Sequence, residues 1–233
     1  MAVGYNPRVV TDGLVLALDA GNTKSYPGTG TTWTDLSGNS NNGTLTNGPT
    51  YSSGSIVFDG TDDYVSLGIN PTGIDQVQVP LTICAWVKAD TFGSYDPIWA
   101  ADKLTTSAGL YSMLRVDSSS VRYYTSTSSG SFQASVGSTL STGTWYFLVV
   151  VVSGSLSSPI IKHYTNGSLV SSSTGYAMSS TPLSNVEFRI GANERTTGER
   201  WDGNIPAVLW YNKALSASEV QQNFNALRGR FGI

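Results

Sequence analysis

The sequence has few charges and no long apolar run. Of its 233 residues only 12% are Asp, Glu, Lys or Arg, against about 25% in an average soluble domain. The net charge of -3 and the lack of a Lys/Arg run exclude the usual kind of nucleic-acid binding. The longest apolar run, from Trp145 to Val152, is far shorter than the roughly 18 residues that a membrane-spanning helix needs. We therefore expect no nucleic acid as a partner and no membrane insertion.

Scarce residue types also limit the chemistry. The lone Cys84 cannot pair within the chain and is expected to be a small buried hydrophobe. The lone His163 lies in an alternating segment, where a structural or surface role is expected rather than that of a base. No Gly-x-Ser-x-Gly elbow supports a catalytic triad. Of the four glutamates, Glu194 and Glu199 share one loop and lack the spacing of a strand-borne catalytic pair. We expect no catalytic residues and no enzyme.

Hydroxyl groups and glycine supply the polarity that charges do not. The chain has 33 Ser, 25 Thr and 25 Gly. Short apolar or alternating runs, such as Leu81–Lys88 and Ile160–Tyr164, recur between Gly/Ser/Asn clusters. Asn166-Gly167 favours a hairpin turn of type I′, in which both central residues have positive φ. This pattern predicts an all-β sandwich or jelly roll.

One segment has the pattern of a helix. Ser216 and Glu219 form a capping box, with the serine before the first turn and the glutamate three residues on. Val220, Phe224 and Leu227 then recur at helical spacing, and Gly229 provides a stop. We expect a short C-terminal helix at about residues 216–228, with its apolar stripe docked on the sandwich.

No composition shift divides the chain. We therefore expect an N-terminal arm at residues 1–12 and one domain at residues 13–233. The first residues lack a basic segment followed by an apolar one, which is the pattern of a secretory signal. If Met1 is the native start, the protein is made in a cytoplasm and leaves by another route, such as assembly into a virus particle. A secreted or cell-surface protein without its leader would have the same sequence.

Aromatic residues near predicted loops suggest carbohydrate binding. Trp99 and Trp201 lie in or beside such loops. A sugar stacks its apolar face on an aromatic ring while polar groups bind its edge, and pockets of this kind are apolar with a few placed polar groups. Tyr111 and Arg195 lie near the same loops and complete the predicted carbohydrate site. The alternative is that the tryptophans fill the core.

Two acidic loops could bind calcium, which prefers six to eight oxygen ligands. The first loop is Asp59–Asp63. The second contains Asn193 and Glu194, with Glu199 and Asp202 further along the chain. Asp102, which comes just after a predicted strand, could join this second group. The alternative is that these turn residues only hydrogen-bond their own backbone.

Several motifs, in order along residues 13–227, carry a family resemblance. They are Gly13–Asp19, Trp33–Asn39, Asn42–Thr44, Phe58–Val65, Leu81–Val87, Trp145–Val149, Tyr164–Gly167, Arg189–Gly191, Asp202–Ile205 and Tyr211–Glu219. On these motifs the chain resembles laminin-G-like domains of the concanavalin A-like lectin/glucanase superfamily. The resemblance implies a jelly roll of two curved antiparallel sheets. From the calcium-binding members it implies metal ligands at Asp102, Asn193 and Glu194.

The resemblance also bears on function. The Glu-x-Asp-x-x-Glu motif of the glucanase branch does not occur in this sequence, so catalysis does not transfer. Stand-alone chains of this kind resemble structural proteins of tailed bacteriophages, which implies a virion location and capsid or tail proteins or cell-surface glycans as partners. We expect a capsid decoration, fibre or adhesin, with homo-oligomers left open. The alternatives are a bacterial carbohydrate-binding domain and, last, a glycan hydrolase.

Overall fold

Two antiparallel sheets of eight strands each form the protein. The computed structural model describes residues 8–75, 78–103, 112–126, 132–174, 177–178, 186–193 and 198–233. In spatial order, sheet 1 contains β14 (Ser168–Thr174), β13 (Ser158–Thr165), β12 (Tyr146–Ser155), β7 (Leu81–Ala89), β16 (Asp202–Tyr211), β5 (Ser55–Asp59) and β4 (Thr50–Ser52). Its eighth strand, β1 (Leu14–Asp19), pairs with β16.

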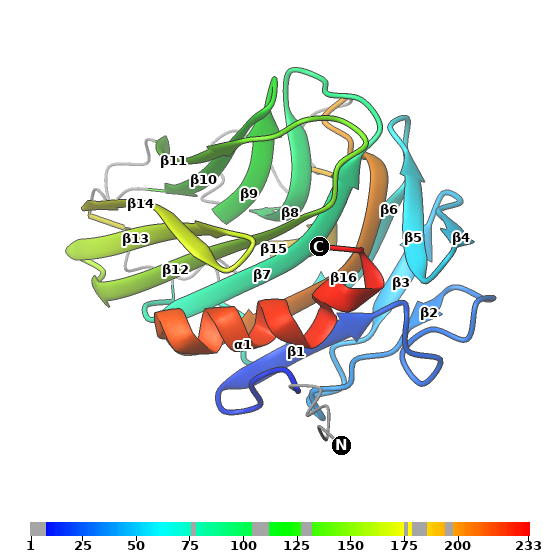
Figure 1. Cartoon of the computed structure of the whole chain (residues 1–233), viewed down its shortest axis with the longest axis horizontal. Helices are drawn as coiled ribbons and strands as arrows, with labels where there is room; N and C mark the ends of the chain where they lie inside the picture. Colours follow the sequence, from blue (N-terminus) through cyan, green and yellow to red (C-terminus); the bar gives the residue numbers. More distant parts are fainter. Residues whose placement is uncertain are drawn as a thin grey trace.

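Sheet 2 lies behind sheet 1 in Figure 1. Its strands, in spatial order, are β11 (Phe132–Thr139), β10 (Ser120–Ser126), β9 (Ser112–Asp117), β8 (Asp96–Lys103), β15 (Val186–Ile190), β6 (Tyr64–Ile69), β3 (Gly43–Thr46) and β2 (Thr32–Trp33). The predicted all-β architecture of two antiparallel sheets is confirmed. The predicted hairpin also forms, because Asn166 and Gly167 have φ of 51° and 81° between β13 and β14.

The inner faces of the two sheets meet in the main core. Alternate side chains of each strand point inward, as a half-buried sheet requires. Trp99 of β8 and Trp210 of β16 join the two sheets with ring centroids 4.5 Å apart. Phe188 of β15 packs against both rings, at 5.7 Å from Trp99 and 6.5 Å from Trp210. These three side chains have no exposed surface, so they fix the distance between the sheets.

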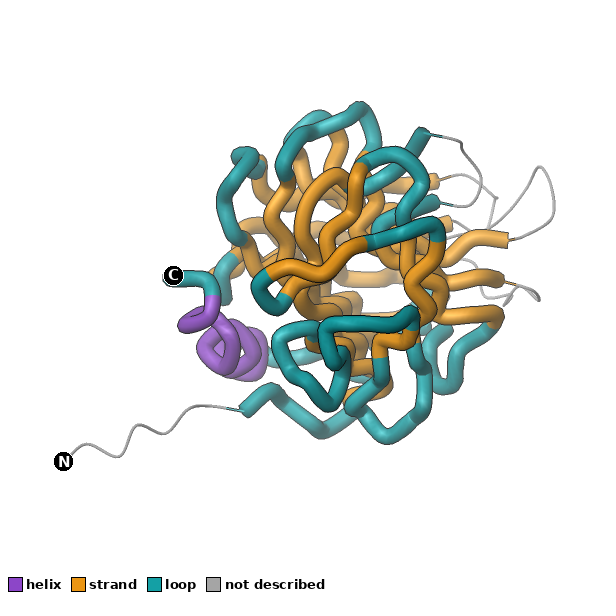
Figure 2. Tube along the Cα trace, turned by 90° about the vertical axis from the view of Figure 1, so that its right-hand side faces the viewer, coloured by secondary structure: helices purple, strands orange, loops and turns teal. Residues whose placement is uncertain are grey.

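The outer face of sheet 1 has a second apolar layer under the helix α1 (Ala217–Leu227). Figures 1 and 2 both place α1 on this side of the strands. Its capping box forms as the sequence predicts, with Ser216 and Glu219 each bonding the other's backbone. Phe224 of α1 stacks on Trp86 of β7 at 5.7 Å. A single turn of 3-10 helix, η1 (Arg228–Arg230), follows.

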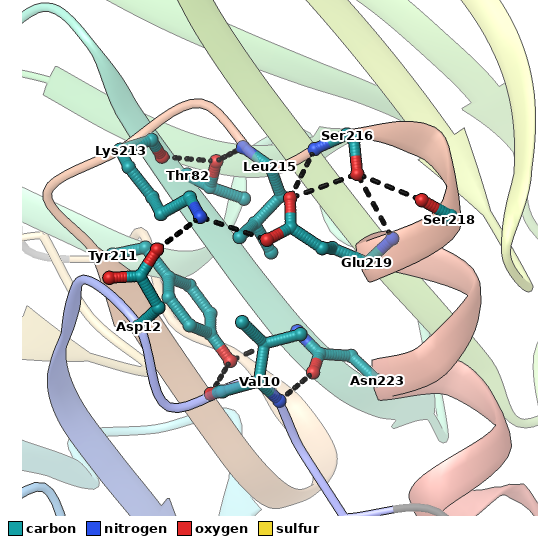
Figure 3. A network of polar contacts seen from close by, with 10 residues as sticks. All are labelled: Val10, Asp12, Thr82, Tyr211, Lys213, Leu215, Ser216, Ser218, Glu219 and Asn223. Atoms are coloured by element: carbon teal, nitrogen blue, oxygen red, sulfur yellow. Dashed lines mark hydrogen bonds and ion pairs between the residues drawn. The ribbon is translucent and has the colours of Figure 1, made fainter.

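A buried polar network ties the chain start to this helix (Figure 3). The Val10 N–H donates to Asn223 Oδ1 at 2.8 Å, and Tyr211 OH donates to the Val10 carbonyl at 2.9 Å. Asn223 Nδ2 donates to Tyr211 OH at 3.0 Å, which closes the triangle. Of the predicted arm, residues 8–12 are thus packed on the domain. Residues 1–7 lie outside the described residues.

A second part of this network fixes the approach to the helix. Lys213 Nζ donates to Asp12 at 2.6 Å and to Glu219 at 2.8 Å. Thr82 of β7 donates to the Lys213 carbonyl and accepts from the Leu215 N–H. The segment between β16 and α1 is therefore bonded to β7 through Thr82, and to the chain start and α1 through Lys213 (Figure 3).

No helix among the described residues is long and apolar enough to cross a membrane.

Asn223→Ala tests the network. The substitution leaves the buried Val10 N–H without a partner and removes a donor to Tyr211, so we expect a loss of about 2 kcal/mol. For a chain of this size that lowers Tm by about 4–8 °C. Asn225→Ala on the same helix is the control, because Asn225 accepts only one 3.3 Å bond from Gln221. Equal melting temperatures for the two variants would contradict the role of the network.

Candidate functional site

The outer face of sheet 2 carries a continuous row of residues across its strands. Pairing in register aligns, from β3 to β10, Thr44, Ser66, Arg189, Ala100, Met113 and Tyr124. Their inward neighbours along each strand belong to the main core. Because side chains alternate between faces along a strand, the inward packing of the core determines which residues form this outer row.

An arginine held between two tyrosines lies beside this row. The guanidinium carbon of Arg115 on β9 lies 4.3 Å from the ring centre of Tyr95 and 4.1 Å from that of Tyr124. Asp117 accepts from Arg115 Nε at 2.6 Å and from Tyr124 OH at 2.7 Å. Glu199 Oε2 lies 3.8 Å from Arg115 Nη1. The arginine side chain is only 10% exposed, so its position is set before any ligand arrives.

A similar stack lies on the other side of β8. Arg189 of β15 lies 4.1 Å from the ring centre of Tyr64 on β6. Arg189 Nη2 donates to Glu187 at 2.7 Å, and Ser66 Oγ donates to the same carboxylate at 2.7 Å. The hydroxyl and the ion pair together orient the guanidinium over the tyrosine ring.

Between the two stacks lie Ala100 and Met113, which point to the outer face but are only 2% and 0% exposed, so other groups cover them. At about 4.8 Å per strand spacing, the four steps from β6 to β10 separate Tyr64 from Tyr124 by roughly 19 Å. The face therefore combines tyrosine rings and fixed hydrogen-bonding groups over an extended length. That combination suits a polar ligand that also has apolar faces.

Trp99 and Trp201, the predicted stacking residues, are not at this surface, and the expectation that their rings are open to a sugar is wrong, whereas the alternative that these tryptophans fill the core holds. Both side chains have 0% exposure and lie in the main core. A register shift between Pro97 and Trp99 turns both Ile98 and Trp99 inward. Trp201 is held just before β16 by its N–H donating to the Gly191 carbonyl at 2.8 Å. Neither indole offers a ring face to a sugar in this structure.

The other predicted sugar contacts, Tyr111 and Arg195, lie outside the described residues. The sequence interpretation missed five residues that the structure brings to the outer face of sheet 2. These are Tyr64, Tyr95, Arg115, Tyr124 and Arg189. Four of them sit on strands, and a signal was available there, since Tyr and Arg alternate with apolar residues in β9, β10 and β15.

The metal ligands implied by the family resemblance do not come together. Asp102 lies within β8 and pairs with Glu187 near the start of β15, whereas Asn193 follows the end of β15. Glu187 and Ile190 alone are separated by about 10 Å along the strand. Because the two strands are antiparallel, segments that follow them emerge at opposite ends. Asn193 Nδ2 instead donates to Glu199 at 2.8 Å, and Glu194 lies outside the described residues.

The other acidic loop does assemble. Carboxylate oxygens of Asp59, Asp62 and Asp63 lie within 4.8 Å of one another. Burial raises the pKa of Asp63, and the two neighbouring carboxylates raise it further. Part of the arrangement is explained by the turn itself, since Asp63 accepts from the Asp59 N–H and Asp59 from the Thr61 N–H. Calcium at this turn stays a prediction.

Two buried titratable groups have strongly shifted pKa values. Asp96, at the start of β8, is 4% exposed, and burial raises its pKa to about 6 although it accepts from the Gly93 N–H. His163 of β13 is 2% exposed, and burial lowers its pKa to about 4. Its Nε2 lies 2.7 Å from Ser135 Oγ. The structural role expected for this histidine is consistent with its burial.

An open cavity of about 360 Å³ lies on the other side of the molecule. It is bordered by the docked chain start, β1, β16 and the end of α1. Most of its lining is aliphatic, including Leu14, Leu36, Leu209 and Leu227. Few polar groups reach it, so it lacks the dense hydrogen bonding found on the outer face of sheet 2.

Comparison with known families agrees with the architecture. The Laminin_G_3 family model, described as the Concanavalin A-like lectin/glucanases superfamily, matches residues 59–221. Because this match covers well over half of the sequence, the chain belongs to that superfamily. A search of curated proteins found no match.

Solved structures share the fold. A Trypanosoma rangeli sialidase in complex with sialic acid has a TM-score of 0.69 and 16% identity, over 94% of this chain and 33% of the sialidase chain. Domain 4 of AbnA, a GH43 extracellular arabinanase from Geobacillus stearothermophilus, was solved with arabinotriose. It has a TM-score of 0.67 and 18% identity, over 90% of this chain and 97% of the domain. The chain thus spans about a third of the sialidase and nearly all of the arabinanase domain.

The pKa of Asp96 predicts a pH-dependent gain from Asp96→Asn. Above pH 6 the folded protein holds a buried carboxylate, and this destabilisation disappears as the pH falls from about 6 towards 4. The asparagine variant should therefore be more stable above pH 6 by up to about 2 kcal/mol, and the gain should vanish near pH 4.

The measurement is the difference in Tm between variant and wild type across this pH range. His163 changes the stability of the fold in the opposite direction. Its imidazole is buried in the neutral form, so the folded protein becomes less stable as the pH falls from 6.5 towards 4. It affects both proteins equally and cancels in the difference. A difference in Tm that does not change with pH would contradict the shifted pKa of Asp96.

Proposed function

We propose that this chain is a non-enzymatic glycan-binding module whose binding face is the outer face of sheet 2. The observation that carries the proposal is the pair of arginine–tyrosine stacks on one sheet face, Arg189 on Tyr64 and Arg115 between Tyr95 and Tyr124. Tyrosine rings can stack on sugar faces while the ordered guanidinium and carboxylate groups bind hydroxyls.

The dimensions favour an oligosaccharide over a single sugar. The roughly 19 Å between Tyr64 and Tyr124 exceeds the size of one sugar ring. The arabinanase domain with the same fold was solved with a trisaccharide, which supports a ligand of this length. The polar groups are already ordered, which lowers the entropic cost of binding.

The acids on this face favour binding over catalysis. Asp117 accepts from Arg115 and Tyr124, and Glu187 accepts from Arg189 and Ser66. Most glycosidases use two carboxyl groups that flank the scissile bond. Here each carboxylate is used to orient an arginine, and this supports a role in positioning rather than in acid–base chemistry.

Tyr95→Ala tests the binding face. Tyr95 is 47% exposed, so its removal should leave the fold intact while it deletes one stacking surface. We expect affinity for the best glycan on an array, and for arabinotriose by calorimetry if it binds, to fall about tenfold. The matched control is Tyr51→Ala, because Tyr51 is 38% exposed and lies on β4 of sheet 1. No glycan bound by the wild type, or equal losses in both variants, would refute this assignment.

We expect the bound glycan to be released unchanged. Incubation of the wild type with that glycan, followed by a reducing-end assay, should detect no new chain ends. New ends that disappear in Glu199→Gln would identify an enzyme and overturn the non-catalytic part of the proposal.

Whether the protein acts as part of a virus particle is a separate question from ligand binding. The structural comparisons above name no phage protein, so a role as capsid decoration, fibre or adhesin stays a prediction from the sequence resemblance. Mass spectrometry of purified virions should find the protein at a stoichiometry set by particle symmetry. Its absence from virions would favour the alternative, a carbohydrate-binding domain that acts outside any particle.

A further inference from the structure

The aliphatic cavity beside α1 interrupts an apolar layer that is filled elsewhere. Under the middle of the helix, the outer face of sheet 1 carries Trp86 and Phe147, whose ring centres lie 5.7 Å and 6.2 Å from that of Phe224 on α1. These large rings hold the helix one full side-chain layer above the strands. Wherever the facing side chains are small, the same spacing leaves a hollow.

Three alanines create this hollow near the last turn of the helix. Ala17 on β1, Ala207 on β16 and Ala226 on α1 all line the cavity of about 360 Å³. Close packing normally leaves few voids larger than a water molecule in an apolar layer, so a hollow of this size is unusual there. Its volume lies within the range of roughly 300–1,000 Å³ that is typical of small-molecule sites.

Hydrogen bonds hold each wall of the cavity in place. The buried network of Figure 3 fixes the chain start, which forms one wall. Leu36 forms another wall, and its N–H donates to the Ala17 carbonyl at 2.9 Å while its side chain stays 39% exposed. Two bonds of 2.6 Å from Arg230 to Asp19 tie the turn after α1 to β1. The cavity is therefore preformed, which lowers the entropic cost of filling it.

The border of the cavity carries an uncompensated positive charge. Two charged side chains line it, Arg8 and Asp19. Arg230 neutralises Asp19 through the two bonds described above. Arg8 is exposed, and its carbonyl accepts from Gln222 Nε2 at 2.8 Å, but its guanidinium pairs with no carboxylate of the described residues. An anionic group at this border would therefore complement Arg8, and the Thr11 hydroxyl on the same lining can donate to it.

We propose that this cavity binds a free single-chain amphiphile with a carboxylate head, an aliphatic carboxylic acid. Its chain packs on the leucines and alanines of the lining, and its head lies beside Arg8. An apolar cavity gives water few hydrogen-bond partners and so favours an apolar occupant. The chain also removes the exposed Leu36 side chain from water. The site lies away from the outer face of sheet 2, and the proposal does not rest on glycan binding there.

The first test is calorimetry of the full chain with carboxylates of increasing length, from butanoate to decanoate. We expect affinity to rise about fourfold for each CH₂ group that enters the cavity and to level off once the cavity is full. Ala226→Leu fills the cavity and should abolish binding without lowering Tm. Leu36→Gln removes one apolar wall and should weaken binding severalfold, whereas Leu169→Gln, at an exposed leucine on β14, should not.

Two results of this first test would overturn the proposal. One is a wild type that binds no carboxylate of the series, as it would if residues 1–7 or a second copy of the chain filled the cavity. The other is wild-type affinity in both Ala226→Leu and Leu36→Gln, which would place the ligand elsewhere.

The second test concerns the head group and compares octanoate with the uncharged octan-1-ol. Arg8→Ala should lower the affinity for octanoate about threefold, the size expected of an exposed ion pair, and leave that for octan-1-ol unchanged. Lys162→Ala is the matched control, because Lys162 is a cation on β13 that does not line the cavity. Unchanged octanoate affinity in Arg8→Ala, or an equal loss for the alcohol, would overturn recognition of a carboxylate at this border.

Discussion

The contact between Trp99, Trp210 and Phe188 is the constraint on which the rest of the structure depends. These rings join β8 and β15 of one sheet to β16 of the other, with the two indoles 4.5 Å apart. Because successive side chains of a strand point to opposite faces, the inward position of these rings determines which residues of the same and neighbouring strands point outward. Arg189 and Arg115 reach the outer face for this reason. The position of the proposed binding face is thus a geometric consequence of the core.

The sequence predicted the fold for reasons that the structure makes clear. Alternation in Leu81–Lys88, the Asn166-Gly167 turn and the capping box of Ser216 and Glu219 are local patterns, and each forms as expected. The binding residues depend on non-local facts. Position beside a loop made Trp99 look exposed, but a bulge in β8 turns it into the core. The metal set implied by the family resemblance failed because antiparallel pairing separates Asp102 from Asn193.

The low charge and the many hydroxyl groups have a structural role as well. Ser135 and Ser138 of β11 bond to His163 and Thr165 of β13, and Ser171 of β14 bonds to β11, so hydroxyl groups join the two sheets here. Some of the few charges orient other groups, as Asp117 does for Arg115 and Glu187 for Arg189. The same composition thus gives the protein ordered polar groups both between its sheets and on the proposed binding face.

The most direct test of the binding face is a titration of isotope-labelled protein with a bound oligosaccharide, followed by amide NMR. The account predicts that the largest shift changes fall on β8, β9, β10 and β15, centred on Arg115 and Arg189, and that the amides of α1 do not move. Changes confined to the surroundings of the aliphatic cavity, near Leu14 and Leu227, would contradict it and place the ligand on the opposite side of the molecule.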